Sequence, residues 1–101
     1  MQLHHLIVRL SEDWGIEIQK GTVLHYEKAG VFEPETREKG ERVYGDKEYV
    51  RLMKIVILSK YFNIPLDLIG EVLRGNKEVC RAVKAGLNRR KKTIAYLLEV
   101  L

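Results

Sequence analysis

Apolar residues recur along most of this chain at the three- and four-residue spacing of an amphipathic helix. The first such stretch runs from Leu3 to Leu10 and predicts a helix over residues 3–14. Gly15 follows directly, as a capping glycine does at the end of a helix. Trp14 closes the helix, and we expect its large side chain to lie in the core.

A second, shorter helix is predicted over residues 22–29, and Gly30 ends it. Pro34 keeps the following stretch out of helical conformation. Charged residues then surround Gly40, which supplies a turn, and the chain returns as a short strand. The segment 31–44 therefore predicts a β-hairpin between two helical regions.

Two more helices follow the hairpin. Asp46 is a good N-cap for a long amphipathic helix over residues 47–62. Pro65 suits the first turn of the next helix, which the stop signal at residues 74–76 ends. The inner residues expected for the long helix include Tyr49, Leu52, Met53, Val56, Ile57 and Leu58.

The last helix, residues 77–101, carries the narrow seam of a coiled coil. Spacings of three and four alternate along it, and every seam position but one is apolar. We expect this helix to pair with a second copy, which makes residues 1–76 a separate head; packing of the helix on that head is the alternative. The seam starts at Cys80, and the expected dimerisation residues are Val83, Leu87, Arg90, Ile94, Leu97 and Leu101.

Several motifs, in order, resemble those of the MerR family of winged helix-turn-helix regulators. Residues 22–34 read TVLHYEKAGVFEP, similar to the family pattern T-L-R-Y-Y-E-x-x-G-L-L-x-P. Residues 42–44, RVY, resemble the R-x-Y that ends the family's wing, and Gly40 matches its wing glycine. Residues 63–69, NIPLDLI, are similar to G-F-S-L-E-E-I, and residues 10–16 fit L-A-x-x-x-G-V.

The resemblance implies a mainly α-helical fold: a winged helix-turn-helix with a small β-hairpin wing and a C-terminal coiled-coil dimerisation helix. It points to the small branch of the family, without an effector domain. The implied function is transcription regulation through double-stranded DNA, with residues 1–76 as the DNA-binding domain and 77–101 as the dimerisation helix. Each head of a homodimer would bind half of a pseudo-palindromic operator.

In the family, the second helix reads the major groove, and the wing and nearby tyrosines hold phosphates. The matching positions here are Lys20, Thr22, His25, Tyr26, Arg37, Arg42 and Tyr44. We add two more cations to the predicted DNA contacts because of their positions in the predicted helix and wing. Lys28 lies on the polar face of the second helix beside His25, and Lys39 lies in the wing.

The formal net charge is +4, which weakly suggests a polyanionic partner. The positive charge lies in the tail, since residues 77–101 hold seven Lys and Arg against two acidic residues. Residues 1–76 hold eleven against twelve. The run Arg89–Lys92 is either the solvated face of a coiled coil or a nucleic-acid patch.

The head departs from the family pattern in its charges. Gly21 and Leu24 stand where the family has arginines, and Glu33, Glu38 and Glu41 make the wing rich in glutamate and nearly neutral. Each missing phosphate contact weakens DNA binding. The alternative function is therefore a small MerR-like adaptor that binds a protein partner, such as a chaperone, instead of DNA.

Other function classes have little support in the sequence. No catalytic constellation is evident, so we expect no enzymatic activity and no cofactor. His4, His5 and His25 lack further ligands at metal-site spacing, and Cys80 is the single cysteine. No apolar stretch is long enough to span a bilayer, and we expect a cytoplasmic protein without membrane contact.

Overall fold

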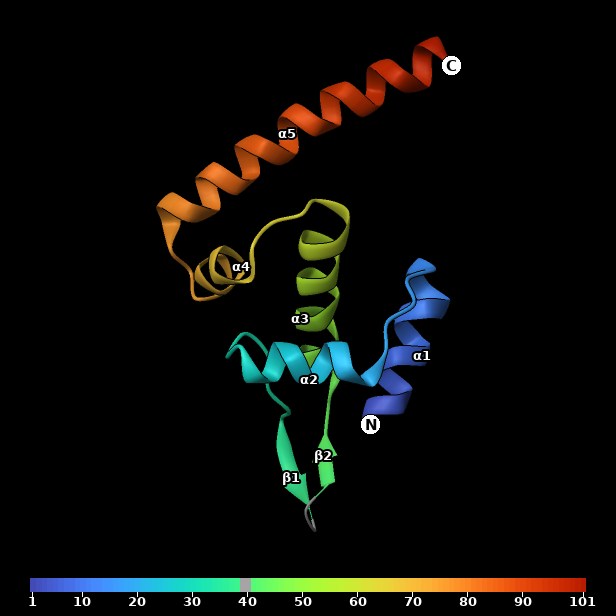
Figure 1. The fold of residues 1–101 in the computed structure, drawn as a ribbon, viewed down its shortest axis with the longest axis vertical. Helices are drawn as coiled ribbons and strands as arrows, with labels where there is room; N and C mark the ends of the chain where they lie inside the picture. The colour runs from blue at the N-terminus through green and yellow to red at the C-terminus, as the bar shows by residue number, and fades with distance from the viewer. Residues whose placement is uncertain (39–40) are drawn as a thin grey trace. The chain divides into compact units, whose positions relative to one another are not determined.

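The computed structural model describes residues 1–38 and 41–101, with the backbone alone for residues 36–38. The chain forms two compact units, Met1–Gly70 and Glu71–Leu101. The first unit contains the first three α-helices, the hairpin, a short π-helical segment and the start of the fourth α-helix, and the second contains the rest of that helix and the long C-terminal helix (Figure 1). The division falls inside a helix, whereas the sequence interpretation places it after residue 76. The mainly α-helical fold with a small wing is confirmed.

The first two helices are α1, Leu3–Trp14, and α2, Lys20–Lys28. Gly15 ends α1 in the left-handed conformation, with φ of 66°, and its N–H donates to the Ser11 carbonyl at 2.8 Å. α2 begins two residues earlier than expected, so Thr22 lies inside the helix and does not cap it.

The expectation that Trp14 lies in the core is wrong, because its side chain is 51% exposed. Trp14 belongs to the last turn of α1 and lies near the hydroxyl of Tyr49. A position at the end of the helix, directly before the capping Gly15, leaves much of the ring in solvent.

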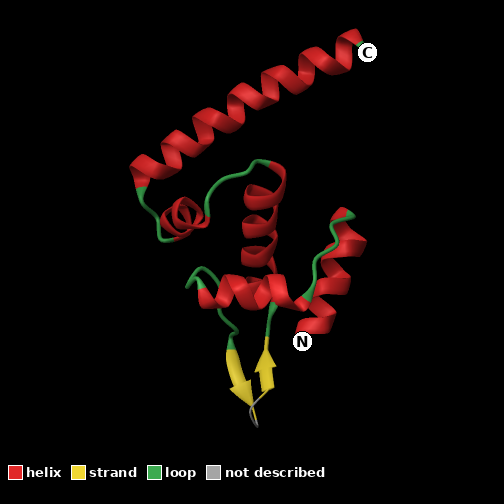
Figure 2. Ribbon diagram, viewed as in Figure 1, coloured by secondary structure: helices red, strands yellow, loops and turns green. Residues whose placement is uncertain are grey.

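The hairpin consists of β1, Thr36–Glu38, and β2, Glu41–Val43, paired antiparallel (Figure 2). The register sets Arg37 opposite Arg42. The expected turn glycine, Gly40, lies outside the described residues. Directly after β2, the backbone N–H of Tyr44 donates to the Met1 carbonyl at 2.7 Å, which ties the start of the chain to the base of the wing.

Helix α3, Asp46–Val56, is capped differently from the prediction. Gly45 is the N-cap, and its backbone N–H donates to Oε1 of Glu48 at 2.9 Å. This is the carboxylate half of a capping box. Asp46 is therefore the first residue of the helix, and its carboxylate accepts from the Arg9 guanidinium at 2.7 Å.

The long helix expected up to Phe62 does not continue as an α-helix. A π-helical segment, η1, Ile57–Tyr61, follows α3, and Asn63 has a φ of 52°. A π turn holds more residues than an α turn and so rotates the side chains that follow it. Ile57 and Leu58, at the start of this segment, are only half-buried. Ile55, which was not expected inside, lies before the segment on α3 and is fully buried.

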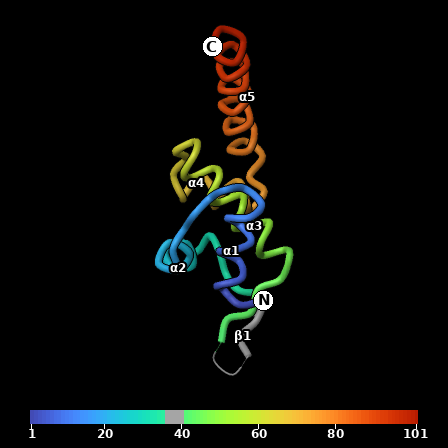
Figure 3. Tube along the Cα trace, turned by 90° about the vertical axis from the view of Figure 1, so that its right-hand side faces the viewer, coloured from blue at the N-terminus to red at the C-terminus, as the bar shows by residue number. Residues whose placement is uncertain are grey.

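The core of the head is formed mainly by side chains of α1, α2 and α3. These three helices lie close together in the Cα trace (Figure 3). Each fully buried aliphatic side chain contributes about 1.5–3 kcal/mol relative to its exposed state. The largest fully buried side chains are Tyr44, Leu6, Leu10, Leu52, Ile55, Ile69, Val23 and Val56.

Two helices remain, α4, Leu66–Leu73, and α5, Lys77–Val100. Asn76 caps α5, since its Oδ1 accepts the N–H of Val79 at 3.3 Å. The carboxylate of Glu71 accepts two hydrogen bonds from the turn between α4 and α5. The Arg74 guanidinium donates one at 2.9 Å and the side-chain amide of Asn76 the other at 3.2 Å. At 1.5 Å per residue, α5 is about 36 Å long. None of the described helices has the length and apolar character to cross a membrane.

Candidate nucleic-acid interface

Helix α2 has one buried and one exposed face. Val23 and Tyr26 are buried, at 0% and 3% exposure, and attach the helix to the core. The outward positions are spaced so that they share the opposite face, and two of them are lysines. The exposed residues are Lys20, Gly21, Leu24, His25 and Lys28. Three of the predicted contact residues, Lys20, His25 and Lys28, therefore do lie together at the surface.

A left-handed glycine directs the chain from α2 into the wing. Gly30 has a φ of 78°, which side chains other than glycine rarely adopt. Its N–H donates to the Glu27 carbonyl at 3.0 Å, and the N–H of Val31 donates to the Tyr26 carbonyl at 3.1 Å. The next residue, Phe32, is then buried with its ring stacked on Tyr44, with centroids 5.7 Å apart. This turn brings the wing alongside the helix.

The carboxylate of Glu27 joins α2 to the wing. Its Oε2 lies 3.0 Å from Nε of Arg42, and its Oε1 accepts the hydroxyl of Tyr44 at 3.3 Å. The Glu27 side chain is only 12% exposed, so the ion pair is shielded on the carboxylate side. The sequence motifs contain all three residues, but nothing in their spacing indicated that they meet.

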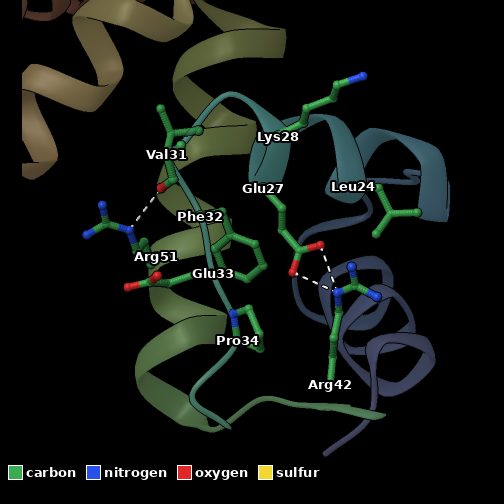
Figure 4. Close-up of a pocket in the computed structure, with 10 residues that line it drawn as sticks. Leu24, Glu27, Lys28, Val31, Phe32, Glu33, Pro34, Arg42 and Arg51 are labelled. Atoms are coloured by element: carbon green, nitrogen blue, oxygen red, sulfur yellow. Dashed lines mark hydrogen bonds and ion pairs between the residues drawn. The ribbon is translucent and has the colours of Figure 1, made fainter. Parts of the chain in front are cut away.

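Arg42 is predicted to contact DNA, and its geometry leaves part of it free to do so. The side chain is 38% exposed, and only Nε faces Glu27 (Figure 4). Among the described residues, no partner is recorded for its two terminal nitrogens. The guanidinium can therefore hold the Glu27 carboxylate and present further N–H donors to a second anion.

Tyr44 is placed differently from a surface contact. It is fully buried, at 0% exposure, and its ring and hydroxyl are used by Phe32 and Glu27. In this structure Tyr44 therefore positions Glu27 and the wing. Tyr26 is also buried, and its hydroxyl hydrogen-bonds Ser59. Burial raises the pKa of Tyr26, and the bond to Ser59 acts in the opposite direction.

A hollow of about 610 Å³ lies between the end of α2 and the wing (Figure 4). Three cations from different elements line it: Lys28 on α2, Arg42 on β2 and Arg51 on α3. Arg51 is held in place because its Nε donates to the Val31 carbonyl at 3.0 Å. Glu27 and Glu33 also line the hollow, so its charge is mixed but positive.

A second hollow, of about 530 Å³, lies beside the first turn of α2. The predicted contact residues Thr22 and His25 line it, and so do Ser59 and Lys60 from the π-helical segment. Sequence reasoning did not select Ser59 or Lys60, because they were placed in an ordinary helix running away from the interface. Both residues belong to the π-helical segment and lie beside α2.

The remaining predicted contacts belong to the wing. Arg37 lies on β1, where the description covers its backbone only, and Lys39 lies outside the described residues. Their roles at the interface stay predictions.

The seam predicted for dimerisation lies on α5 and is apolar and accessible. Val83 and Leu87 are half-buried, whereas Ile94, Leu97 and Leu101 are 50%, 45% and 98% exposed. The sixth predicted residue, Arg90, is exposed as well. An apolar surface of this extent on an exposed helix is typical of a contact with another chain.

A family model described as MerR HTH family regulatory protein matches residues 10–76, which is more than half of the chain. A search of curated proteins and a search of solved structures each found no match. The matched stretch contains α2, the wing, α3 and the π-helical segment, and so includes every residue that lines the two hollows.

Proposed function

Because the chain belongs to the MerR family of helix-turn-helix regulatory proteins, we propose that it regulates transcription as a homodimer bound to a pseudo-palindromic operator. Each head, residues 1–76, places α2 in the major groove and rests its wing on the adjoining backbone. Residues 77–101 hold the two heads together. The spacing of the half-sites then follows from the separation of the two α2 helices.

The observation that carries this proposal is the connection of Glu27 with Arg42 and Tyr44. It fixes the wing relative to α2 before any ligand arrives, and a preformed site binds without a further cost of ordering. The cations that surround the adjoining hollow, Lys28, Arg42 and Arg51, then form one surface suited to a phosphate backbone.

Within this interface the residues have different tasks. Lys20, His25 and Lys28 lie on the exposed face of α2, where side chains reach base edges or phosphates. Tyr26 and Tyr44 lie behind that face and hold it in place. Thr22 and His25 line the second hollow with Lys60, and this arrangement offers a further phosphate contact.

The test is fluorescence anisotropy with the full chain, DNA from its own upstream region and random duplex, over a series of salt concentrations. We expect tighter binding to the upstream DNA. Lys28→Ala should make the slope of log K against log salt shallower by about 0.9, the value of one lost phosphate contact. Lys54→Ala is the matched control, since Lys54 is exposed on α3 and lines neither hollow. Absence of DNA binding at low salt would overturn the proposal.

One observation favours the second candidate function, a protein-binding adaptor. Leu24 is 40% exposed on the outward face of α2, where it offers an apolar contact in place of a charged one. An apolar protein contact depends little on salt, whereas a phosphate contact depends on it steeply. Leu24→Ser should leave the salt slope unchanged if α2 binds DNA.

A further inference from the structure

One face of α5 carries a row of cations with no acidic residue among them. The row follows the helical spacing of three and four residues, with the exposed polar residue Asn88 in its middle. All its members are exposed. We call this row the basic stripe; it consists of Lys77, Arg81, Lys84, Lys91 and Lys92.

The basic stripe and the apolar seam occupy different faces of the same helix. With 3.6 residues per turn, the mean directions of the two rows are about 120° apart around the axis. A second copy on the seam therefore leaves the stripe accessible. Arg89 lies on the third face, about 120° from the mean direction of each row, and so provides an internal control.

The stripe lacks the charge partners that other cations of this chain have. Arg9, Arg42 and Arg74 each form an ion pair with a carboxylate. No ion pair is recorded for any member of the stripe among the described residues. Neighbouring cations three or four residues apart on a helix repel one another, and an anionic partner removes that repulsion.

From this arrangement we propose that the basic stripe binds the phosphate backbone of a second segment of double-stranded DNA. Lys77 to Lys92 extend over about 22 Å of helix, a length that spans about six base pairs at 3.4 Å per pair. No aromatic residue lies within the stripe to stack on an unpaired base, which single-strand binding requires. The contact is therefore electrostatic and independent of sequence.

While the head holds the operator, the stripe holds the second segment, so the protein bridges two duplexes. This bridging role rests on the proposed function of the head. Lys77, Lys84 and Lys91 also share the heptad position next to the seam, because they recur every seven residues. In an antiparallel pair, these positions of the two copies lie on the same side. The dimer then presents a single row of lysines contributed by both chains.

The test is a bridging assay with the full-length protein. One duplex carries the upstream sequence and is immobilised, and a fluorescent random duplex is free in solution. We expect the protein to capture the free duplex. The fourfold variant Arg81→Gln, Lys84→Gln, Lys91→Gln and Lys92→Gln should lower that capture at least tenfold. Its binding to random duplex should have a salt slope shallower by about 3 to 4, the value of four phosphate contacts.

A pair of double variants provides the matched comparison. Lys84→Gln with Lys91→Gln should reduce capture, whereas Arg89→Gln with Lys54→Gln, which also removes two cations, should not. Circular dichroism and sedimentation of each variant confirm an unchanged fold and oligomeric state. The proposal would be overturned if the fourfold variant captured the free duplex as well as the unaltered protein does and had the same salt slope. The same result would be obtained if the stripe bound an acidic protein and not DNA.

The outcomes separate the stripe from the head. If the head does not bind DNA, the preference for upstream sequence is absent, but the fourfold variant still flattens the salt slope on random duplex. If the stripe does not bind DNA, the preference for upstream sequence persists and the fourfold variant has the slope of the unaltered protein.

Discussion

Glu27 on α2 and Arg42 on β2 form an ion pair at 3.0 Å, and the hydroxyl of Tyr44 donates to the same carboxylate. The side chain of Glu27 is largely enclosed, while that of Arg42 remains partly in solvent. An enclosed carboxylate depends on its partners much more than an exposed one does. The orientation of the wing relative to the helix therefore depends on one largely enclosed carboxylate.

Removal of Arg42 should destabilise the head through the carboxylate that it leaves behind. Arg42→Ala leaves Glu27 with the weak bond from Tyr44 alone, and we expect a loss of about 1–3 kcal/mol in the free energy of unfolding. Adding Glu27→Gln should recover part of that loss, because the neutral amide needs no cation. Urea denaturation of the two single variants and the double variant measures the coupling, which should exceed about 0.5 kcal/mol.

The exposed pair between Arg74 and Glu71 is a suitable control. Both side chains are about half-exposed, at 57% and 42%, and such pairs contribute only about 0–1 kcal/mol. Arg74→Ala should therefore change stability much less than Arg42→Ala. Equal losses in the two variants would mean that the shielding of Glu27 has no energetic effect.

Tyr49 should make the protein sensitive to alkaline pH. Burial, and then the hydrogen bond to Asp13 at 2.6 Å, raise the pKa of Tyr49 from 10.0 to about 12. The folded state thus holds the phenol proton more tightly than the unfolded chain does. The resulting stability is fully present below pH 10 and is lost as the pH rises toward 12.

Denaturation curves recorded between pH 9 and about 12 measure this effect, because the predicted loss falls in that window. In Tyr49→Phe this part of the alkaline loss should disappear, although the variant is less stable at neutral pH without the bond to Asp13. Parallel pH profiles for the two proteins would contradict the assignment of the raised pKa to Tyr49.

Lys60 should behave as a DNA contact although it lies on the helix after α3. It lines the hollow beside Thr22 and His25 on α2, and its side chain is exposed. We expect Lys60→Ala to weaken binding to upstream and random DNA alike and to lower the salt slope by about 0.9. Anisotropy titrations measure both quantities. A slope equal to that of Lys54→Ala would place Lys60 outside the interface.

The parts of this fold that could be predicted from sequence are those with local causes. The three- and four-residue spacing gives the helices, and the left-handed glycines Gly15 and Gly30 end α1 and direct the chain after α2. The exposed face of α2 follows from the same periodicity. The family motifs add the wing, whose strands are too short to show a pattern of their own.

The features that escaped prediction leave no recognisable pattern in the sequence. The pairing of Glu27 with Arg42 needs the turn at Gly30, and the cap of α3 needs Glu48 to reach back to Gly45. The π-helical segment has no periodicity that distinguishes it from an α-helix over so few residues. For this reason the sequence alone did not place Lys60 beside α2.

Dimerisation through α5 should depend mainly on the seam of that helix. Leu87 lies in the middle of the seam, and a carboxylate there would be buried against a second copy without a partner, at a cost of several kcal/mol. We therefore expect Leu87→Asp to be monomeric at concentrations where the unaltered protein is a dimer. Sedimentation equilibrium measures the change directly.

Ala85→Asp is the matched control, because Ala85 is exposed on the face of α5 away from the seam and the same carboxylate is introduced. It should remain dimeric. An antiparallel arrangement adds a second signature: Lys84 of each copy lies on the side that carries the partner's lysines, so added salt should tighten the dimer by screening their repulsion. A dimer that weakens with salt would instead indicate that attractive ion pairs hold the two helices together.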